Sequence, residues 1–413
     1  MTLLQHTRAS TIPDANARRW RILALLAVAE LLGMSLWFTA SASAAQLRVL
    51  WDLDAPAAAM LTTAVQIGFV AGTAAAALLN LADLIPARRY MAGSAVLAAL
   101  ANAALLVAPG YGAALLARAL TGFFLAGVYP PAMKMAATWF QSGRGLAIGT
   151  IVGALTIGKA MPYLSSALPG LDWQWVVGTA SLGALVAAAL IAIGYRDGPF
   201  AFPQRRFSFR LVGRVLRHRP TRLAIGGYLG HMWELYAMWT LTAAFFFDYF
   251  RAHGSTGGEA GASAGVVAFA AIAIGGLGSV LAGQWADRLG RERIAIWSLI
   301  VSGACSLMIG WLTFLPAIML IALALVWGFA IVADSAQFSA LVTEVAPPHA
   351  VGTALTLQTS LGFALTALSI WLTVVIAAAV GWGPAFTMLA VGPALGIWAM
   401  ARLKNERAGG ASG

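Results

Sequence analysis

Long runs of apolar residues dominate the pattern along this chain. Residues 55–82, 90–117, 173–195 and 260–286 contain no Asp, Glu, Lys or Arg. Each run is long enough to cross a bilayer once, because a spanning helix needs about 20 residues. The uncharged runs 294–333 and 345–401 are each long enough for two crossings, with breaks at Pro316 and at 381–384. The pattern therefore predicts a membrane protein built of helices.

Together with the runs that carry one or two charges, the pattern predicts twelve transmembrane helices. Their spans are 22–47, 57–81, 90–108, 112–139, 145–168, 173–195, 223–249, 263–286, 294–314, 316–341, 350–380 and 383–401. The chain then divides into a tail 1–21, a helical region 22–195, a central loop 196–222, a second helical region 223–401 and a tail 402–413.

Composition agrees with this interpretation. Of the 413 residues, 60% are hydrophobic and 10% are charged, whereas soluble domains carry about 25% charged residues. The single cysteine, Cys305, lies in an apolar run, so disulfide frameworks and cysteine metal clusters are excluded. A soluble protein with so much apolar surface would aggregate.

The net charge of +11 is explained by membrane orientation. Most of the 26 basic residues fall in the two tails, the central loop and the loops on the same side, and only Arg48 and Arg251 fall in loops on the other side. Because basic loops stay in the cytoplasm, we expect both termini to be cytoplasmic and the protein to lie in the inner (plasma) membrane. No nucleic-acid partner is needed to explain the charge.

The central loop carries an amphipathic pattern. Leu211, Val212, Val215 and Leu216 alternate with Arg210, Arg214 and Arg217 at helical spacing. This favours a basic helix on the inner leaflet, and a solvated linker is the alternative. The segment 251–263, rich in Gly, Ser and Ala, is expected to be a flexible connector.

The two halves of the chain repeat each other. Glu30-Leu31-x-x-Met34 recurs as Glu234-Leu235-x-x-Met238, at an offset of 204, and Asp83 matches Asp287 at the same offset. Gly145-Leu146-Ala147 matches Gly352-Thr353-Ala354 at an offset of 207. The sequence therefore predicts a duplicated six-helix unit.

At this point the sequence resembles the major facilitator superfamily. The segment Gly283-Gln284-Trp285-Ala286-Asp287-Arg288-Leu289-Gly290-Arg291 is close to the family's signature, and its copy near Asp83 is degenerate, with Leu79 and Pro86 in place of glycines. Arg118-x-x-x-Gly122 is similar to a second signature. The Gly-Pro pair of many drug:proton antiporters is missing from the fifth helix.

The resemblance implies two pseudo-symmetric six-helix bundles and transport by alternating access. It also implies that the first, fourth, seventh and tenth helices line a central cavity, and that the second, fifth, eighth and eleventh form the contact between halves. The residues implied to gate the cytoplasmic side are Asp83, Arg88, Arg89, Gly283, Asp287, Arg288, Gly290 and Arg291.

Two other motifs resemble a nucleotide-binding site and a catalytic site but lack residues or structure that these sites need. Gly153–Lys159 imitates the start of a phosphate-binding loop, but Ala160 replaces the Ser or Thr that binds Mg²⁺ and no strand precedes it. Gly261-Ala262-Ser263-Ala264-Gly265 lacks the strand and helix of a nucleophile elbow. We expect no enzyme activity, no cofactor and no metal site.

Charges inside the membrane are the candidate functional residues, because each costs about 2.5–3.5 kcal/mol at the bilayer centre. Glu30, Glu234 and His231 are predicted to couple protons. The predicted substrate-binding residues are Arg118, Lys134, Asp334, Tyr129, Trp37, Tyr236 and Lys159. The alternative is a set of buried ion pairs that only holds the helices together. Pro130 and Pro131 remove backbone donors and should open the fourth helix beside Lys134.

Glu30 and Glu234 occupy equivalent places in the repeats, so we expect them on opposite walls of one cavity. His231 lies one turn from Glu234, whereas the helix of Glu30 has no basic residue within two turns. Glu30 should therefore take up a proton more readily, because an isolated carboxylate is poorly stabilised in an apolar site. Glu234 should be held charged or share a proton with His231.

The sequence thus favours a monomeric, proton-coupled symporter of a small organic or inorganic anion, with protons, the substrate and the lipid bilayer as its partners. Proton-driven export of cationic or amphipathic compounds is the second hypothesis. A membrane receptor without transport activity is the third.

Overall fold

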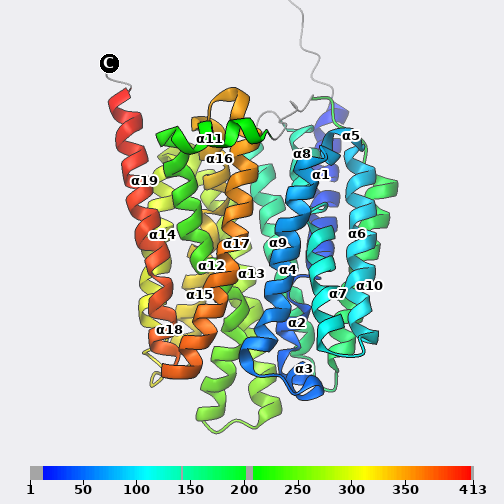
Figure 1. Cartoon of the computed structure of the whole chain (residues 1–413), viewed down its shortest axis with the longest axis vertical. Coiled ribbons are helices and arrows are strands. Elements are labelled where there is room, and N and C mark those ends of the chain that lie inside the picture. The colour runs from blue at the N-terminus through cyan, green and yellow to red at the C-terminus, as the bar shows by residue number, and fades with distance from the viewer. Residues whose placement is uncertain (1–12, 141–142, 201–207, 411–413) are drawn as a thin grey trace, which may run out of the picture.

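The computed structural model describes residues 13–140, 143–200 and 208–410, and within these residues every regular element is a helix (Figure 1). The first half of the chain contains α1 (Pro13–Met34), α2 (Thr39–Ala42), α3 (Ala44–Trp51), α4 (Ala55–Leu78), α5 (Leu81–Leu84), α6 (Ala87–Ala103), the 3-10 turn η1 (Ala104–Val107), α7 (Tyr111–Leu125), α8 (Tyr129–Ala137), α9 (Arg144–Ser166) and α10 (Trp173–Gly194).

The second half begins after the central loop. It contains α11 (Phe209–Arg217), α12 (Arg219–Ala252), α13 (Gly257–Leu289), α14 (Arg291–Met308), α15 (Ala317–Ala333), α16 (Ser335–Val345), η2 (Pro348–Ala350), α17 (Val351–Val380), α18 (Trp382–Leu389) and α19 (Val391–Gly410).

Nine segments within the described residues are long and apolar enough to cross a membrane. They are Ala55–Leu78, Ala87–Val107, Tyr111–Ala137, Gly145–Ser166, Trp173–Gly194, Gly257–Leu289, Ala317–Val345, Pro348–Val380 and Trp382–Ala408. The other three expected spans coincide with α1, α12 and α14, which carry charged residues inside the helix or at one end.

Several long helical segments are interrupted. The first expected span, 22–47, breaks between Met34 and Thr39, and the fourth breaks between Leu125 and Tyr129. In the fourth span the break precedes Pro130 and Pro131, which occupy the first turn of α8, where a missing N–H is tolerated. The expected opening of this helix is thus confirmed.

The helix contacts in the first half recur in the second. α1 packs against α9 and α10, α4 against α7, and α6 against α10; correspondingly α12 packs against α17 and α19, α13 against α15, and α14 against α19. The two sets of contacts follow the same order along the chain, in agreement with the sequence repeat.

The most extensive contacts between the halves in the described residues are those of α9 with α13 and of α4 with α17. Small residues bring α9 and α13 together, since a Cβ added to Gly153 would lie only 3.0 Å from the carbonyl oxygen of Gly276. Close approach of backbones through small residues is the usual means of packing transmembrane helices.

The segment predicted to be a flexible connector, 251–263, is instead largely helical. α13 begins at Gly257, and a capping box fixes its start: Glu259 N–H donates to Thr256 Oγ1, and Thr256 N–H donates to Glu259 Oε2. The prediction was wrong because the capping box of Thr256 and Glu259 starts the helix despite the neighbouring glycines.

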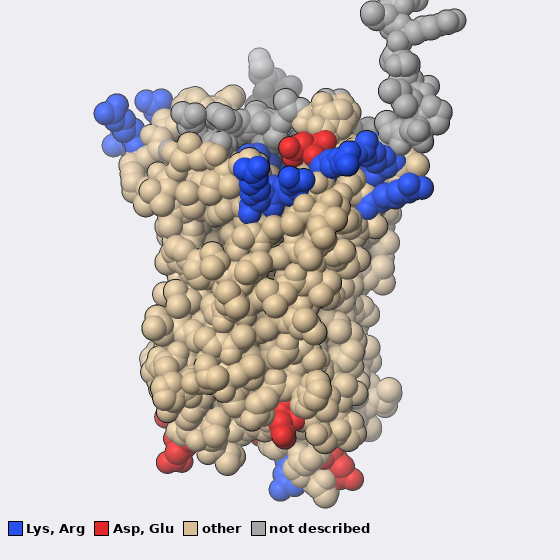
Figure 2. All heavy atoms as spheres, turned by 90° about the vertical axis from the view of Figure 1, so that its right-hand side faces the viewer, with Lys and Arg blue, Asp and Glu red and all other residues tan. Residues whose placement is uncertain are grey.

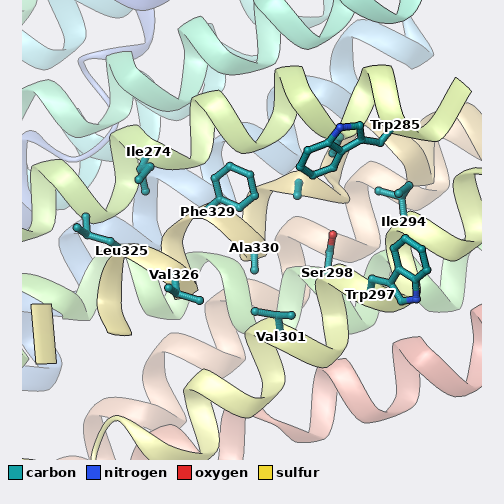
Figure 3. Close-up of a pocket in the computed structure, with 12 residues that line it drawn as sticks. Ile274, Trp285, Ile294, Trp297, Ser298, Val301, Leu325, Val326, Phe329 and Ala330 are labelled. Atoms are coloured by element: carbon teal, nitrogen blue, oxygen red, sulfur yellow. The ribbon is translucent and has the colours of Figure 1, made fainter. Parts of the chain in front are cut away.

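The amphipathic segment of the central loop forms α11, which packs against α17 and α12. Val215 is buried there, while Arg210 and Arg217 are exposed. In Figure 2, Lys and Arg side chains gather at one end of the molecule, and the broad middle of this face shows no charged side chains.

Candidate functional site

A buried lysine lies where the two halves meet. Lys159 extends from α9, and its Nζ lies 3.9 Å from the ring centroid of Trp37, 4.7 Å from that of Tyr236 and 5.5 Å from that of Trp239. Its ammonium group also donates a hydrogen bond to the Tyr236 hydroxyl of α12. Aromatic faces attract a desolvated cation, so these rings hold the ammonium in an aromatic box.

Further aromatic rings close the box. Phe363 of α17 lies 5.6 Å from Trp37 and 5.2 Å from Tyr236 between centroids, and Phe69 of α4 lies 4.5 Å from Phe363. Tyr163, one turn after Lys159, donates a 2.9 Å hydrogen bond to the carbonyl oxygen of Trp239. The cluster therefore draws on α4, α9, α12, α17 and the break between α1 and α2.

Glu30 is the carboxylate of this region. It is fully buried on α1, and it interacts electrostatically with Lys159 and with Tyr129 of α8. Within the described residues, neither of its carboxylate oxygens has a hydrogen-bond partner. A buried carboxylate without donors is costly, so a proton, the nearby ammonium or a bound molecule has to stabilise it.

Arg118, predicted to bind substrate, forms hydrogen bonds at the break between α1 and α2. Its guanidinium donates to the carbonyl oxygens of Leu36 and Trp37, at 3.1 Å and 2.6 Å, and to Thr39 Oγ1 at 2.9 Å. These carbonyl groups are released by the break between α1 and α2, and inside a membrane they need a donor. Arg118 thus stabilises the break in which Trp37 contacts Lys159, through hydrogen bonds to backbone carbonyl groups.

The second half contains its own buried polar groups. Glu234 accepts hydrogen bonds from Trp327 Nε1 of α15 at 2.7 Å and from Ser302 Oγ of α14 at 2.9 Å. Tyr236 lies two residues further along α12, about 200° around the helix, and points to Lys159. Glu234 therefore faces α14 and α15, and the expectation that it faces Glu30 across one cavity is wrong.

His231 pairs with Asp334 and not with Glu234 as expected. Its Nδ1 lies 2.8 Å from Asp334 Oδ1, and its Nε2 lies 3.0 Å from Ser335 Oγ, with all three residues at the junction of α12 with α15 and α16. Both His231 and Asp334 are 1% exposed. Asp334, predicted to bind substrate, is thus half of a buried pair within the second half.

Ion pairs connect the helices at the end of the molecule that is rich in Lys and Arg, here called the basic end. Arg291 binds Glu344 Oε1 at 2.7 Å and Asp287 Oδ1 at 3.5 Å, and Arg407 binds Glu292 Oε1 at 2.6 Å. Asp287 also reaches the first half, because a Cβ added to Gly145 would lie 3.1 Å from its Oδ2. Its carboxylate therefore lies at the N-terminus of α9, where the helix dipole attracts negative charge.

Residues 23–370 match the model of a family described as the Major Facilitator Superfamily. The chain belongs to this superfamily. Its members are in general membrane transporters and not enzymes. Together with the apolar helices, the match identifies a multi-pass membrane protein. No curated protein matches the chain.

The residues of the superfamily signature, Gly283–Arg291, lie at the end of α13 and the start of α14. Gly290 adopts φ +94° between α13 and α14, a conformation that favours glycine, and Gly283 faces Gly145 of α9. Arg288 and Arg89 are exposed and Arg88 is half-buried. The side chain of Asp83, in α5, lies outside the described residues.

Of the predicted substrate residues of this transporter, Trp37 and Tyr236 contact Lys159. Lys159 and Tyr129 in turn interact electrostatically with Glu30. Lys134 is half-buried in the last turn of α8. Sequence reasoning missed Phe363, Ser302 and Trp327, because an apolar helix gives no sign of which of its faces meets a charge. Asn102 of α6, whose Oδ1 accepts a hydrogen bond from Arg118, was also missed, although an amide in an apolar helix is a signal of such a contact.

Proposed function

We propose that the protein is a secondary active transporter that moves a small organic or inorganic anion together with protons by alternating access. Twelve crossings in two six-helix bundles would be formed by α1–α2, α4, α6–η1, α7–α8, α9, α10, α12, α13, α14, α15–α16, α17 and α18–α19. The repeated helix contacts support this arrangement. The end rich in Lys and Arg, which holds the C-terminus, would face the cytoplasm of the inner membrane (Figures 1 and 2).

One observation carries the proposal: a buried ammonium lies at the junction of the halves, and a buried carboxylate, Glu30, interacts with it electrostatically. Lys159 comes from the first half, and its hydrogen-bond partner Tyr236 comes from the second. A residue that bonds across this junction senses the relative position of the halves. A substrate that binds Lys159 in place of Tyr236 would bind the two states of the transporter differently, as alternating access requires.

Proton coupling follows from competition for Lys159. When Glu30 is charged, it stabilises the ammonium group and leaves little positive potential for an anion. When Glu30 takes up a proton, Lys159 becomes an uncompensated cation in a site of low dielectric and attracts an anion strongly. Proton and anion therefore enter together, and a symporter results. The pair of His231 and Asp334 would form a second protonation site, away from the substrate.

The aromatic box supports the second hypothesis, export of organic cations. Trp37, Tyr236 and Trp239 already bind an ammonium group, so a cationic compound could displace Lys159 and take Glu30 as its counter-charge. Such a compound would compete with protons, and the product would be a proton-driven antiporter.

A substrate panel on liposomes that contain the purified protein tests the proposal. With an acidic outside, anions should accumulate inside, and the interior should acidify in step with uptake. Extrusion of cations driven by proton entry would favour the antiporter. If no compound moves while anions still change thermal stability, a receptor without transport is the function.

A further inference from the structure

A groove separate from the central junction lies between α12 and α19. It is a cavity of about 500 Å³ whose lining includes Arg219, Arg222 and Arg402 together with Leu223, Gly226 and Trp398. Arg219 and Arg222 lie in the first turn of α12, directly after α11, and Arg402 lies on α19 about two turns before the end of that helix. Gly226 lies one turn further along α12 than Arg222, and Trp398 lies one turn before Arg402 on α19. The groove therefore has arginines toward one end and uncharged residues one turn away from them.

Positive charge is in excess in this groove. Arg219 binds Glu406 Oε1 at 2.6 Å. Within residues 13–140, 143–200 and 208–410, the guanidinium groups of Arg222 and Arg402 have no carboxylate partner. That of Arg402 lies 5.9 Å from the ring centroid of Trp398. Two arginines that share one pocket without a counter-charge repel each other, and an anion placed between them would relieve this repulsion.

An apolar stripe leads away from the arginines. Val391, Leu395, Trp398 and Arg402 follow one another at spacings of three and four residues, so they lie on one face of α19. The first three are exposed, Trp398 by 57% of its surface. Tryptophan is enriched where the apolar core of a membrane meets the headgroups, so Trp398 places Arg402 at headgroup level.

Glycine leaves room for a chain at the floor of the groove. Gly226 of α12 is half-buried, and a Cβ added to it would lie 3.5 Å from Ala399 Cβ. Any larger side chain at position 226 would fill the space between the helices. The groove is therefore shaped for a molecule with an anionic head and an apolar tail.

We propose that this groove binds an anionic phospholipid of the surrounding leaflet. The phosphate lies between Arg222 and Arg402, and an acyl chain runs along Trp398, Leu395 and Val391. Basic pockets between transmembrane helices are known to hold anionic headgroups in this way. Because the lipid contacts both α12 and α19, it joins the helix that carries Tyr236 to the last helix and stabilises the second half.

The test uses the full-length protein in mild detergent. Lipid that stays bound is measured by native mass spectrometry, and thermal stability is followed while phosphatidylglycerol, phosphatidylcholine or inorganic phosphate is added. We expect phosphatidylglycerol to bind and to raise the melting temperature, and the other two to do neither. Equal effects of both lipids, or the same effect with inorganic phosphate, would refute a specific anionic phospholipid site.

Two variants and one control locate the site. Arg222→Gln with Arg402→Gln should weaken phosphatidylglycerol binding about thirtyfold, because each arginine near the surface contributes about fivefold. Lys404→Gln removes a charge from the same helix, two residues away and on another face, and should leave binding unchanged. If this control reduces binding as much as the double variant, the attraction is diffuse and the proposal fails.

A third variant keeps every charge. Gly226→Leu fills the floor of the groove and should displace the lipid while the arginines remain. Arg222→Lys with Arg402→Lys serves if the glutamine variant does not fold, and it should bind less lipid than the wild type because lysine lacks the bidentate fork. Undiminished binding by both variants would place the lipid elsewhere.

Discussion

Glu30 and Glu234 occupy the same place in the two sequence repeats, yet their surroundings differ. Glu234 is held by donors from α14 and α15, whereas the carboxylate of Glu30 has Lys159 of α9 as its electrostatic partner. One position in a duplicated unit is thus a hydrogen-bonded carboxylate in one half and, within the described residues, a carboxylate without a hydrogen bond in the other. Repeat symmetry predicts where a charge lies but not what it does.

The difference has its origin in residues on neighbouring helices. α6 and α14 begin 204 residues apart, at Ala87 and Arg291, so Ser302 corresponds to Ala98, which has no hydroxyl group to donate. At the offset of 207 for α9 and α17, Lys159 corresponds to Thr366, which donates to the carbonyl oxygen of Phe363. Each half therefore lacks the partner that the other half provides for its glutamate.

The largest effect should come from Lys159→Met. Loss of the cation that interacts with Glu30 should lower anion binding at least about thirtyfold, because removal of one partner of a buried charge pair costs about 2–5 kcal/mol. Equilibrium binding of the transported anion measures this effect. Lys159→Arg is the control and should retain part of the affinity; equal binding by the methionine variant would exclude Lys159 as the anion site.

Glu30→Gln should separate exchange from accumulation. An anion with one negative charge, coupled to one proton, accumulates about tenfold per pH unit in the wild type, since about 1.4 kcal/mol corresponds to a factor of ten. The variant mimics the protonated carboxyl, so its uptake should be independent of the pH gradient while anion exchange continues. Full accumulation driven by the gradient would show that another group carries the proton.

Asp287→Asn tests whether the contact of Asp287 with the N-terminus of α9 contributes to the change between the two states of the transporter. Removal of a charge from the N-terminus of α9 should cost about 0.3–1 kcal/mol, or about two- to fivefold in the balance between states. Cysteines placed in the junction should become more accessible from the cytoplasmic side, with the fold intact by circular dichroism. Unchanged labelling rates would contradict a gating role.

Glu234→Gln should have the smallest effect on transport. The amide has one acceptor oxygen, so the donor of either Ser302 or Trp327 loses its partner, and stability should fall by about 1–3 kcal/mol. Accumulation in a pH gradient should survive, in contrast to Glu30→Gln. A loss of accumulation with unchanged stability would reverse the roles of the two glutamates.

Much of the fold was predictable from the apolar runs, because a helix that enters lipid has to satisfy its own backbone and leaves a uniform signal. The break at Pro130 and the amphipathic helix around Val215 were predictable for similarly local reasons. The start of α13 also depends on local residues, because Thr256 and Glu259 form its capping box. It was not predicted, since the glycines nearby are typical of a loop.

The sequence by itself determined the helical membrane class, the repeat, the family and the set of charges buried in the membrane. Only the tertiary structure decided the partners of these charges: Tyr236 for Lys159, Asp334 for His231, and the backbone at Trp37 for Arg118. Hydrophobic periodicity records burial along one helix, whereas these partners come from different helices. Their pairing depends on how helices rotate and pack against each other, which no local pattern specifies.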